Sequence, residues 1–147
     1  MWPICAPSSS SAMPESIPPA LCAVGHRLPP LAMPALSCTT LALYAGASGD
    51  HNPNHIDIDA ARAAGQDDVF AHGMLVMAWL GRMLTGWVPQ QAILSFDTRF
   101  AGMTRVGERI TCSGEVVEKQ DGTIVVQVQA SNEHGELKAT GRAVIAV

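Results

Sequence analysis

The sequence has little positive charge, no long uninterrupted hydrophobic run and no closely spaced pair of cysteines. Each absence argues against a class of protein. Its 147 residues carry 9 Lys and Arg against 13 Asp and Glu, which leaves no basic surface for nucleic acid. No apolar run reaches the roughly eighteen residues that a membrane-spanning helix needs. The four cysteines are Cys5, Cys22, Cys38 and Cys112. They lack Cys-x-x-Cys spacing, which indicates reduced thiols rather than disulfides or a zinc site. We therefore expect a cytoplasmic protein.

Length and composition predict one folded domain preceded by a tail. A chain of 147 residues with 48% hydrophobic residues can bury one core of its own. Residues 1–22 are rich in Pro and Ser and have neither the basic start nor the continuous apolar run of a secretory signal. We interpret them as a flexible tail and expect the domain to occupy residues 23–147.

The most informative stretch is residues 44–57, which places Asp50 and His55 on one turn. The preceding residues 41–47 are apolar and favour a helix, whereas Gly49 and Pro53 favour turns, and proline cannot continue a hydrogen-bonded helix. A carboxylate and an imidazole held on such a loop can bind one water molecule and move its protons near neutral pH. Asp50 and His55 are therefore candidate catalytic residues.

Two metal-binding interpretations of this stretch fail on spacing. Asp50, Asn52 and Asn54 begin like a calcium loop, but the sixth position is His55 rather than Gly and the twelfth is Ala61 rather than Glu. His51 and His55 have the i, i+4 spacing of two ligands on a helix, yet Pro53 lies between them. We therefore expect no metal. The remaining alternative is that the polar residues only satisfy backbone N–H groups of a turn.

The rest of the chain predicts helices followed by an antiparallel sheet. We expect helices at residues 38–47, capped by Ser37, at residues 59–64, with Asp57 or Asp59 near the start, and from about 72 to 87. The last is apolar nearly all round and predicts a buried core helix. Alternation then predicts strands at residues 92–100, 109–119, 123–132 and 136–147, with a two-residue hairpin turn at Asp121 and Gly122, and a short first strand at 26–29. Together they indicate an α+β domain with a sheet wrapped around a central helix.

The start of the predicted third helix offers a further candidate catalytic group. The first N–H groups of a helix lack internal partners and carry the positive end of its dipole. Gly73 would let a carbonyl oxygen approach these groups closely, which makes the position a candidate oxyanion hole. The alternative is that His72 and Gly73 simply begin a helix.

The stretch resembles the hydratase motif of the MaoC-like, R-specific enoyl-CoA hydratases and the related 3-hydroxyacyl dehydratases. The matching residues are Tyr44, Ser48, Gly49, Asp50, Asn52, Pro53 and His55. The resemblance continues through residues 70–75, which are similar to the family's His-Gly-Met-Leu helix start, and more loosely to Val147. One departure is Asn54, where the family usually has an aliphatic residue.

The resemblance implies a hotdog fold and a function. The reaction would be reversible addition of water to a trans-2-enoyl thioester, giving the R-3-hydroxyacyl thioester. Asp50 and His55 would hold the water, and the Gly73 N–H would polarise the thioester carbonyl. Ser48 and Asn52 would fix the loop from behind.

The resemblance also implies partners and alternatives. Tyr44 would pack beside the acyl channel. No cofactor is implied beyond the coenzyme A of the substrate, with acyl carrier protein as the other possible thioester handle. The working unit would be a homodimer or a heterodimer with a related subunit. Two alternatives stay open: a hotdog acyl thioesterase and a non-catalytic acyl-binding accessory subunit.

Overall fold

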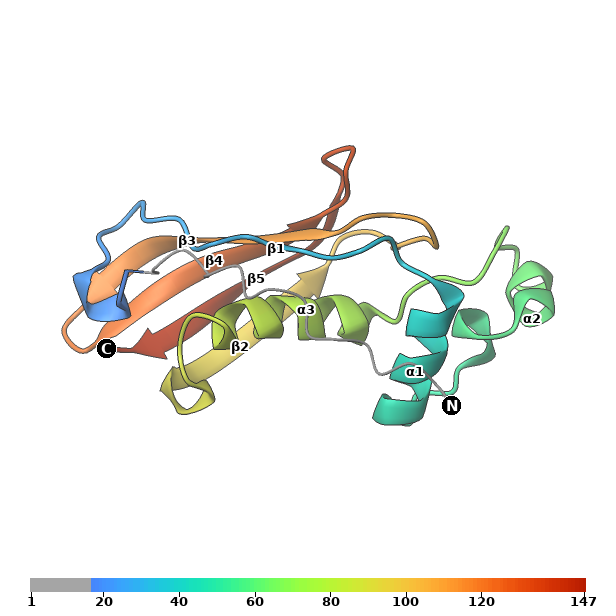
Figure 1. The fold of residues 1–147 in the computed structure, drawn as a ribbon, viewed down its shortest axis with the longest axis horizontal. Helices are drawn as coiled ribbons and strands as arrows, with labels where there is room; N and C mark the ends of the chain where they lie inside the picture. Colours follow the sequence, from blue (N-terminus) through green and yellow to red (C-terminus); the bar gives the residue numbers. More distant parts are fainter. Residues whose placement is uncertain (1–16) are drawn as a thin grey trace, which may run out of the picture.

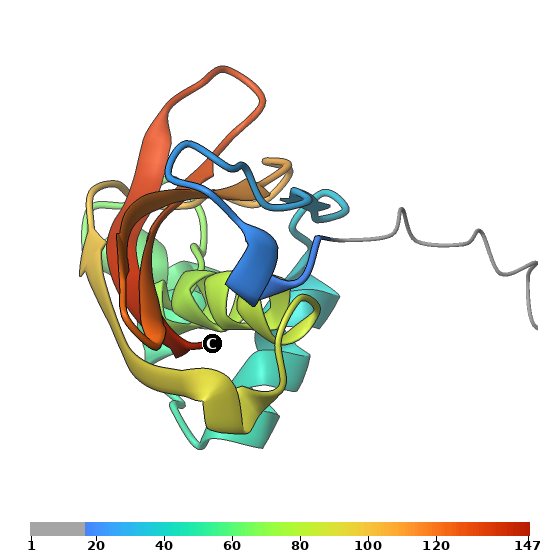
Figure 2. The same ribbon diagram turned by 90° about the vertical axis from the view of Figure 1, so that its left-hand side faces the viewer.

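The computed structural model describes residues 17–147, in which a curled antiparallel sheet wraps around the helix α3 (Figures 1 and 2). Most of the expected tail, residues 1–16, lies outside the described residues. The helices are α1 (Cys38–Ser48), α2 (Ile58–Ala63) and α3 (Gly73–Thr85), with 3-10 turns η1 (Pro19–Leu21), η2 (Pro53–His55) and η3 (Gln90–Ala92). The strands are β1 (Leu31–Ala32), β2 (Ile93–Phe100), β3 (Thr111–Gln120), β4 (Thr123–Ser131) and β5 (Leu137–Ala146).

The sheet has the strand order β1-β3-β4-β5-β2, and every neighbouring pair is antiparallel. The expected turn at Asp121 and Gly122 joins β3 to β4, where Gly122 adopts a φ of +78°. Alternate residues of β3, β4 and β5 are buried toward α3, as the alternation in the sequence predicted. The four strands predicted between residues 92 and 147 are confirmed, and each observed end lies within two residues of the predicted one.

The cysteines of the described region are free thiols. Cys22 and Cys112 lie in the core, and Cys38 is exposed at the start of α1. Burial raises the pKa of the Cys112 thiol to about 12, so this group stays protonated at neutral pH. None of the helices in the described region has the length and hydropathy that a membrane crossing needs.

The core helix α3 is buried on the side that faces the sheet, so the prediction of a buried core helix is confirmed for that side only. The side that faces the sheet is buried through Leu75, Val76, Trp79, Leu80, Met83 and Leu84. On the opposite side Met74 is 53% exposed, and Ala78 is exposed as well. An all-apolar sequence cannot tell which side of a helix the sheet covers, and here the sheet covers one. The exposed apolar side lies outside the core of this chain.

The predicted first strand at residues 26–29 is wrong in position, because β1 is formed by Leu31–Ala32. Residues 25–28 do lie along β3, with Leu28 N–H donating to Gly114 O at 2.9 Å. Pro29 and Pro30 follow and have no N–H to donate, so the ladder is interrupted and resumes at Leu31.

Contacts in the described chain begin before residue 23. Ile17 O accepts a hydrogen bond from Trp87 Nε1 at 3.0 Å, and Lys119 Nζ donates to Ala20 O and Cys22 O. Cys22 is 1% exposed and belongs to the core. Residues 17–22 therefore contact α3's C-terminal end and β3.

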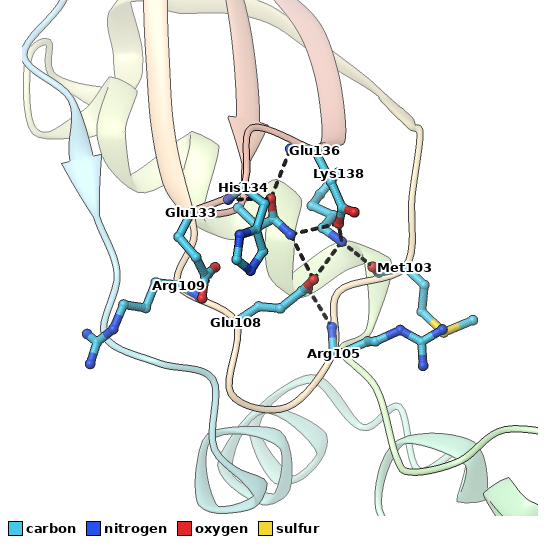
Figure 3. A network of polar contacts seen from close by, with 9 residues as sticks. Met103, Arg105, Glu108, Arg109, Glu133, His134, Glu136 and Lys138 are labelled. Atoms are coloured by element: carbon cyan, nitrogen blue, oxygen red, sulfur yellow. Dashed lines mark hydrogen bonds and ion pairs between the residues drawn. The ribbon is translucent and has the colours of Figure 1, made fainter.

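A buried polar cluster joins the loop between β2 and β3 to the turn between β4 and β5 (Figure 3). Lys138 is only 6% exposed, and its Nζ donates to Glu108 at 2.8 Å and to Glu136 at 3.1 Å. Asn132 Nδ2 donates to the same two carboxylates at 2.9 and 2.7 Å. Burial alone would raise the pKa of Glu108, but hydrogen bonds from Lys138, the Arg105 N–H and Asn132 outweigh it and lower this pKa.

This lowered pKa predicts an acid-dependent contribution to stability. A carboxyl group with a depressed folded-state pKa stabilises the fold fully above its unfolded pKa, here 4.5, and loses this contribution as pH falls through the folded value. Glu108→Gln should therefore be less stable than wild type at pH 7, and the gap should shrink as pH falls below about 4.5. Urea unfolding across this pH range measures both free energies. A gap that stays constant with pH would contradict the prediction.

Candidate active site

Asp50 lies where α1 ends and the chain reverses toward η2. Gly49 caps α1 with a φ of +75°, a left-handed conformation that glycine adopts without strain. Side-chain oxygens then accept successive backbone N–H bonds: Ser48 Oγ from Asp50, Asp50 Oδ1 from Asn52, and Asn52 Oδ1 from Asn54. These local bonds hold the loop in one shape and leave the exposed Asp50 with a second carboxylate oxygen.

His55 is buried in η2 with its ring held by the backbone. It is 9% exposed, and its Nδ1 lies 2.8 Å from Phe70 O, while the Phe70 ring meets the imidazole edge-on. A carbonyl oxygen only accepts hydrogen bonds, so Nδ1 carries the proton and Nε2 of the neutral ring keeps a free lone pair. The backbone thus sets which nitrogen can take up a proton.

His72 is the residue that sequence reasoning missed. It is 1% exposed at the N-terminal boundary of α3, and its Nε2 donates to Asp50 O at 3.0 Å. Its ring packs at a tilt against His55, with centroids 4.0 Å apart, and against Tyr44, with centroids 4.9 Å apart. It therefore ties the loop that carries Asp50 to the start of α3. The signal in the sequence was a single histidine beside a glycine at the start of an otherwise apolar helix.

Tyr44 lies half-buried on α1 beside this group. Burial raises the pKa of its phenol, and the negative charge of Asp50 raises it further. Tyr44 therefore keeps its proton at neutral pH.

Gly73 begins α3 with a free backbone N–H and with little room for a side chain. Within residues 17–147 no hydrogen bond from the Gly73 N–H is formed, so the group is free to donate. An added Cβ would also lie 3.2 Å from the Phe100 ring, closer than ordinary contact. A hollow of about 190 Å³ opens here, lined by Phe70, Ala71, Gly73, Val76, Phe100 and Thr104 among others. A second hollow of about 290 Å³ lies on the His55 side, next to Cys38, Ala42 and Ile58.

The three polar side chains are close enough to act together. One ligand-type atom each from Asp50, His55 and His72 lies within 4.8 Å of the others. Such a distance allows one water molecule to contact a carboxylate and an imidazole at once. Two imidazoles and a carboxylate are also ligands that Zn²⁺ accepts, so dialysis against EDTA is part of the activity test below. Asp50 and His55 thus lie together as the sequence predicted, next to His72, which directly precedes Gly73.

Comparisons with known proteins agree on one family. The sequence profile described as "MaoC like domain" matches residues 29–137. A mitochondrial 3-hydroxyacyl-[acyl-carrier-protein] dehydratase of Arabidopsis thaliana is 32% identical over 74 residues, which cover 50% of this chain and 45% of that protein. The chain thus spans less than half the length of this relative. The beta subunit of the 3-oxo-4,17-pregnadiene-20-carboxyl-CoA hydratase of Mycobacterium tuberculosis is 31% identical over 99 residues, 67% of this chain and 77% of that subunit.

The structural comparison agrees. The R-hydratase PhaJ1 of Pseudomonas aeruginosa superposes with a TM-score of 0.79 at 27% identity, covering 89% of this chain and 86% of that one. The curled sheet around α3 is the hotdog fold, which confirms the expected architecture.

Proposed function

Because the chain belongs to the MaoC-like hydratase and dehydratase family, we propose that it hydrates trans-2-enoyl-CoA reversibly to R-3-hydroxyacyl-CoA. The observation that carries the proposal is the grouping of Asp50 with the buried His55 and with His72, the residue that precedes Gly73 and its free N–H. A carboxylate, a basic imidazole nitrogen and an oxyanion donor are the three groups that addition of water to an enoyl thioester requires.

In the proposed reaction, Asp50 and His55 hold one water molecule between them. One of the pair takes a proton as the water oxygen bonds to C3, and the other delivers a proton to C2 on the same face. We assign the two roles to the pair and not to either residue alone. The Gly73 N–H donates to the thioester oxygen as negative charge develops on it.

The remaining residues of the motif act by holding these groups. Ser48 and Asn52 keep the loop in shape through the bonds to Asp50 and Asn54, and His72 holds the Asp50 carbonyl. Tyr44 packs beside the acyl channel, against the His72 ring. We propose that the reaction needs no metal and no cofactor other than the coenzyme A or acyl carrier protein of its substrate.

We propose further that two copies of the chain form a dimer. We also propose that the protein is located in the cytoplasm. Within residues 17–147 no strand pairs with the outer edge of β2, and this strand exposes Leu94 and Phe100. Unpaired edges with apolar side chains invite a partner strand. The M. tuberculosis relative is named as one subunit of a hydratase, so a related second subunit is the alternative partner.

The test is loss of enoyl absorbance with crotonyl-CoA and with a longer trans-2-enoyl-CoA, followed by chiral analysis of the product. We expect R-3-hydroxyacyl-CoA, formed at the same rate after dialysis against EDTA. Light scattering on the same sample should give twice the chain mass of 15.5 kDa. Release of free thiol would instead show a thioesterase. Tight binding of acyl-CoA by the folded protein without turnover, alone and with added acyl carrier protein substrate, would show an accessory subunit.

A further inference from the structure

We propose that the buried Lys138–Glu108 pair positions groups of the active site. The pair holds the loop 101–109, and this loop holds the segment from the Phe70 carbonyl, which accepts from His55, to the N–H of Gly73. The inference rests on the proposed function. Neither residue belongs to the hydratase motif, and they come from the loop before β3 and from β5, far from Asp50 in the sequence.

The pair forms hydrogen bonds with backbone groups of Met103 and Arg105, the residues on either side of Thr104 (Figure 3). Lys138 Nζ donates to Met103 O at 2.9 Å, and Glu108 Oε2 accepts from Arg105 N–H at 2.8 Å. The Lys138 to Glu108 bond of 2.8 Å closes this clamp. Thr104 adds no side-chain bond of its own, because its hydroxyl is buried without a partner in residues 17–147. The clamp thus holds the backbone on both sides of Thr104.

Thr104 in turn holds the segment before α3. Its carbonyl accepts a hydrogen bond from Ala71 N–H at 2.9 Å, and Arg105 and Phe70 pair through an isolated antiparallel β-bridge of their backbones. Ala71 stands between the Phe70 carbonyl, which fixes the His55 ring, and the start of α3 at Gly73. Displacement of Thr104 would thus move the imidazole and the oxyanion donor relative to each other.

A direct test replaces Lys138 by Met, which keeps the stem and removes the ammonium group, and separately replaces Glu108 by Gln, which disturbs the fold less. Because misplacement of catalytic groups by about 1 Å costs up to about a hundredfold, we expect kcat with crotonyl-CoA to fall about tenfold or more. KM should stay within about threefold in Glu108→Gln, because Glu108 does not line the hollow beside Gly73, whereas Lys138 does.

Arg142→Met is the matched control. Arg142 lies on the same strand β5 and pairs with Glu118 on β3, but both side chains are about half exposed. We expect wild-type kcat for this variant. Circular dichroism and the melting temperature establish that each variant is folded at the assay temperature. A folded Lys138→Met or Glu108→Gln enzyme with wild-type kcat would overturn the proposal, as would an equal loss in Arg142→Met.

A second readout does not depend on activity. Hydrogen exchange, measured by mass spectrometry on peptides covering residues 69–75, should be faster in Lys138→Met than in wild type and unchanged in Arg142→Met. Unchanged exchange in Lys138→Met would overturn the clamp even if activity falls. If wild type has no hydratase activity but exchange rises as expected, the proposed function fails and the mechanical link between Lys138 and the Phe70 segment stands.

Discussion

Replacing Asp50 by Asn should lower the turnover of trans-2-enoyl-CoA by a factor of about 100 or more while the fold stays intact, because the loss is that of acid-base help. The amide has nearly the same shape, and its Oδ1 can still accept the bond from Asn52 N–H. Asp50 is exposed, so the substitution buries no new polar group. What the variant lacks is a group that takes up or delivers a proton.

The measurement is kcat with crotonyl-CoA, together with a thermal melt. Asp59→Asn is a matched control, because Asp59 is an exposed carboxylate in the first turn of α2, beyond the catalytic loop. We expect wild-type turnover for this control. Near wild-type activity in Asp50→Asn would remove the carboxylate from the mechanism.

His55→Gln should have an effect of similar size, about 100-fold or more on kcat. A glutamine side chain can donate an N–H toward the Phe70 carbonyl, so the buried bond need not be lost. It offers no basic nitrogen toward Asp50, and the proton relay is interrupted. The His72 ring remains against position 55, with its Nε2 donating to Asp50 O.

His51→Gln provides the control for this variant. His51 lies in the same loop, only four residues away, but it is exposed and is not among the grouped side chains. Equal turnover in His51→Gln and wild type, with a large loss in His55→Gln, would assign the effect to position 55. Equal losses at both positions would indicate general disturbance of the loop and contradict the assigned role.

Local pattern was sufficient where neighbours in the chain determine the structure. Ser37 caps α1 by accepting a bond from Thr40 N–H, Asp57 caps α2, and Asp121 and Gly122 form the β3–β4 turn, as predicted. Alternation located the four strands of 92–147 because a sheet buries every second side chain on one face. Pro53 and Gly49 likewise limited the catalytic loop to a turn that brings Asp50 near His55.

Three features followed only from the folded chain, since they depend on residues far apart in the sequence. The exposed side of α3 results from where the sheet ends, and the sequence of the helix is apolar on both sides. The contact of His72 with Asp50 O spans 22 positions, and that of Lys138 with Glu108 spans 30. Composition and spacing carry no record of such pairings, because a hydrogen bond across the core is set by how the elements pack.

The sequence by itself thus determined the local elements, the loop that carries Asp50 and His55, and the glycine at the start of α3. The tertiary structure decided the tautomer of His55 through the Phe70 carbonyl, the burial of His72, and the support of the Phe70 segment by the loop before β3. The physical reason is the range of the interactions. Caps, turns and alternation act between near neighbours in the chain, whereas the orientation of a side chain in the site is set by backbone groups that only the complete fold brings beside it.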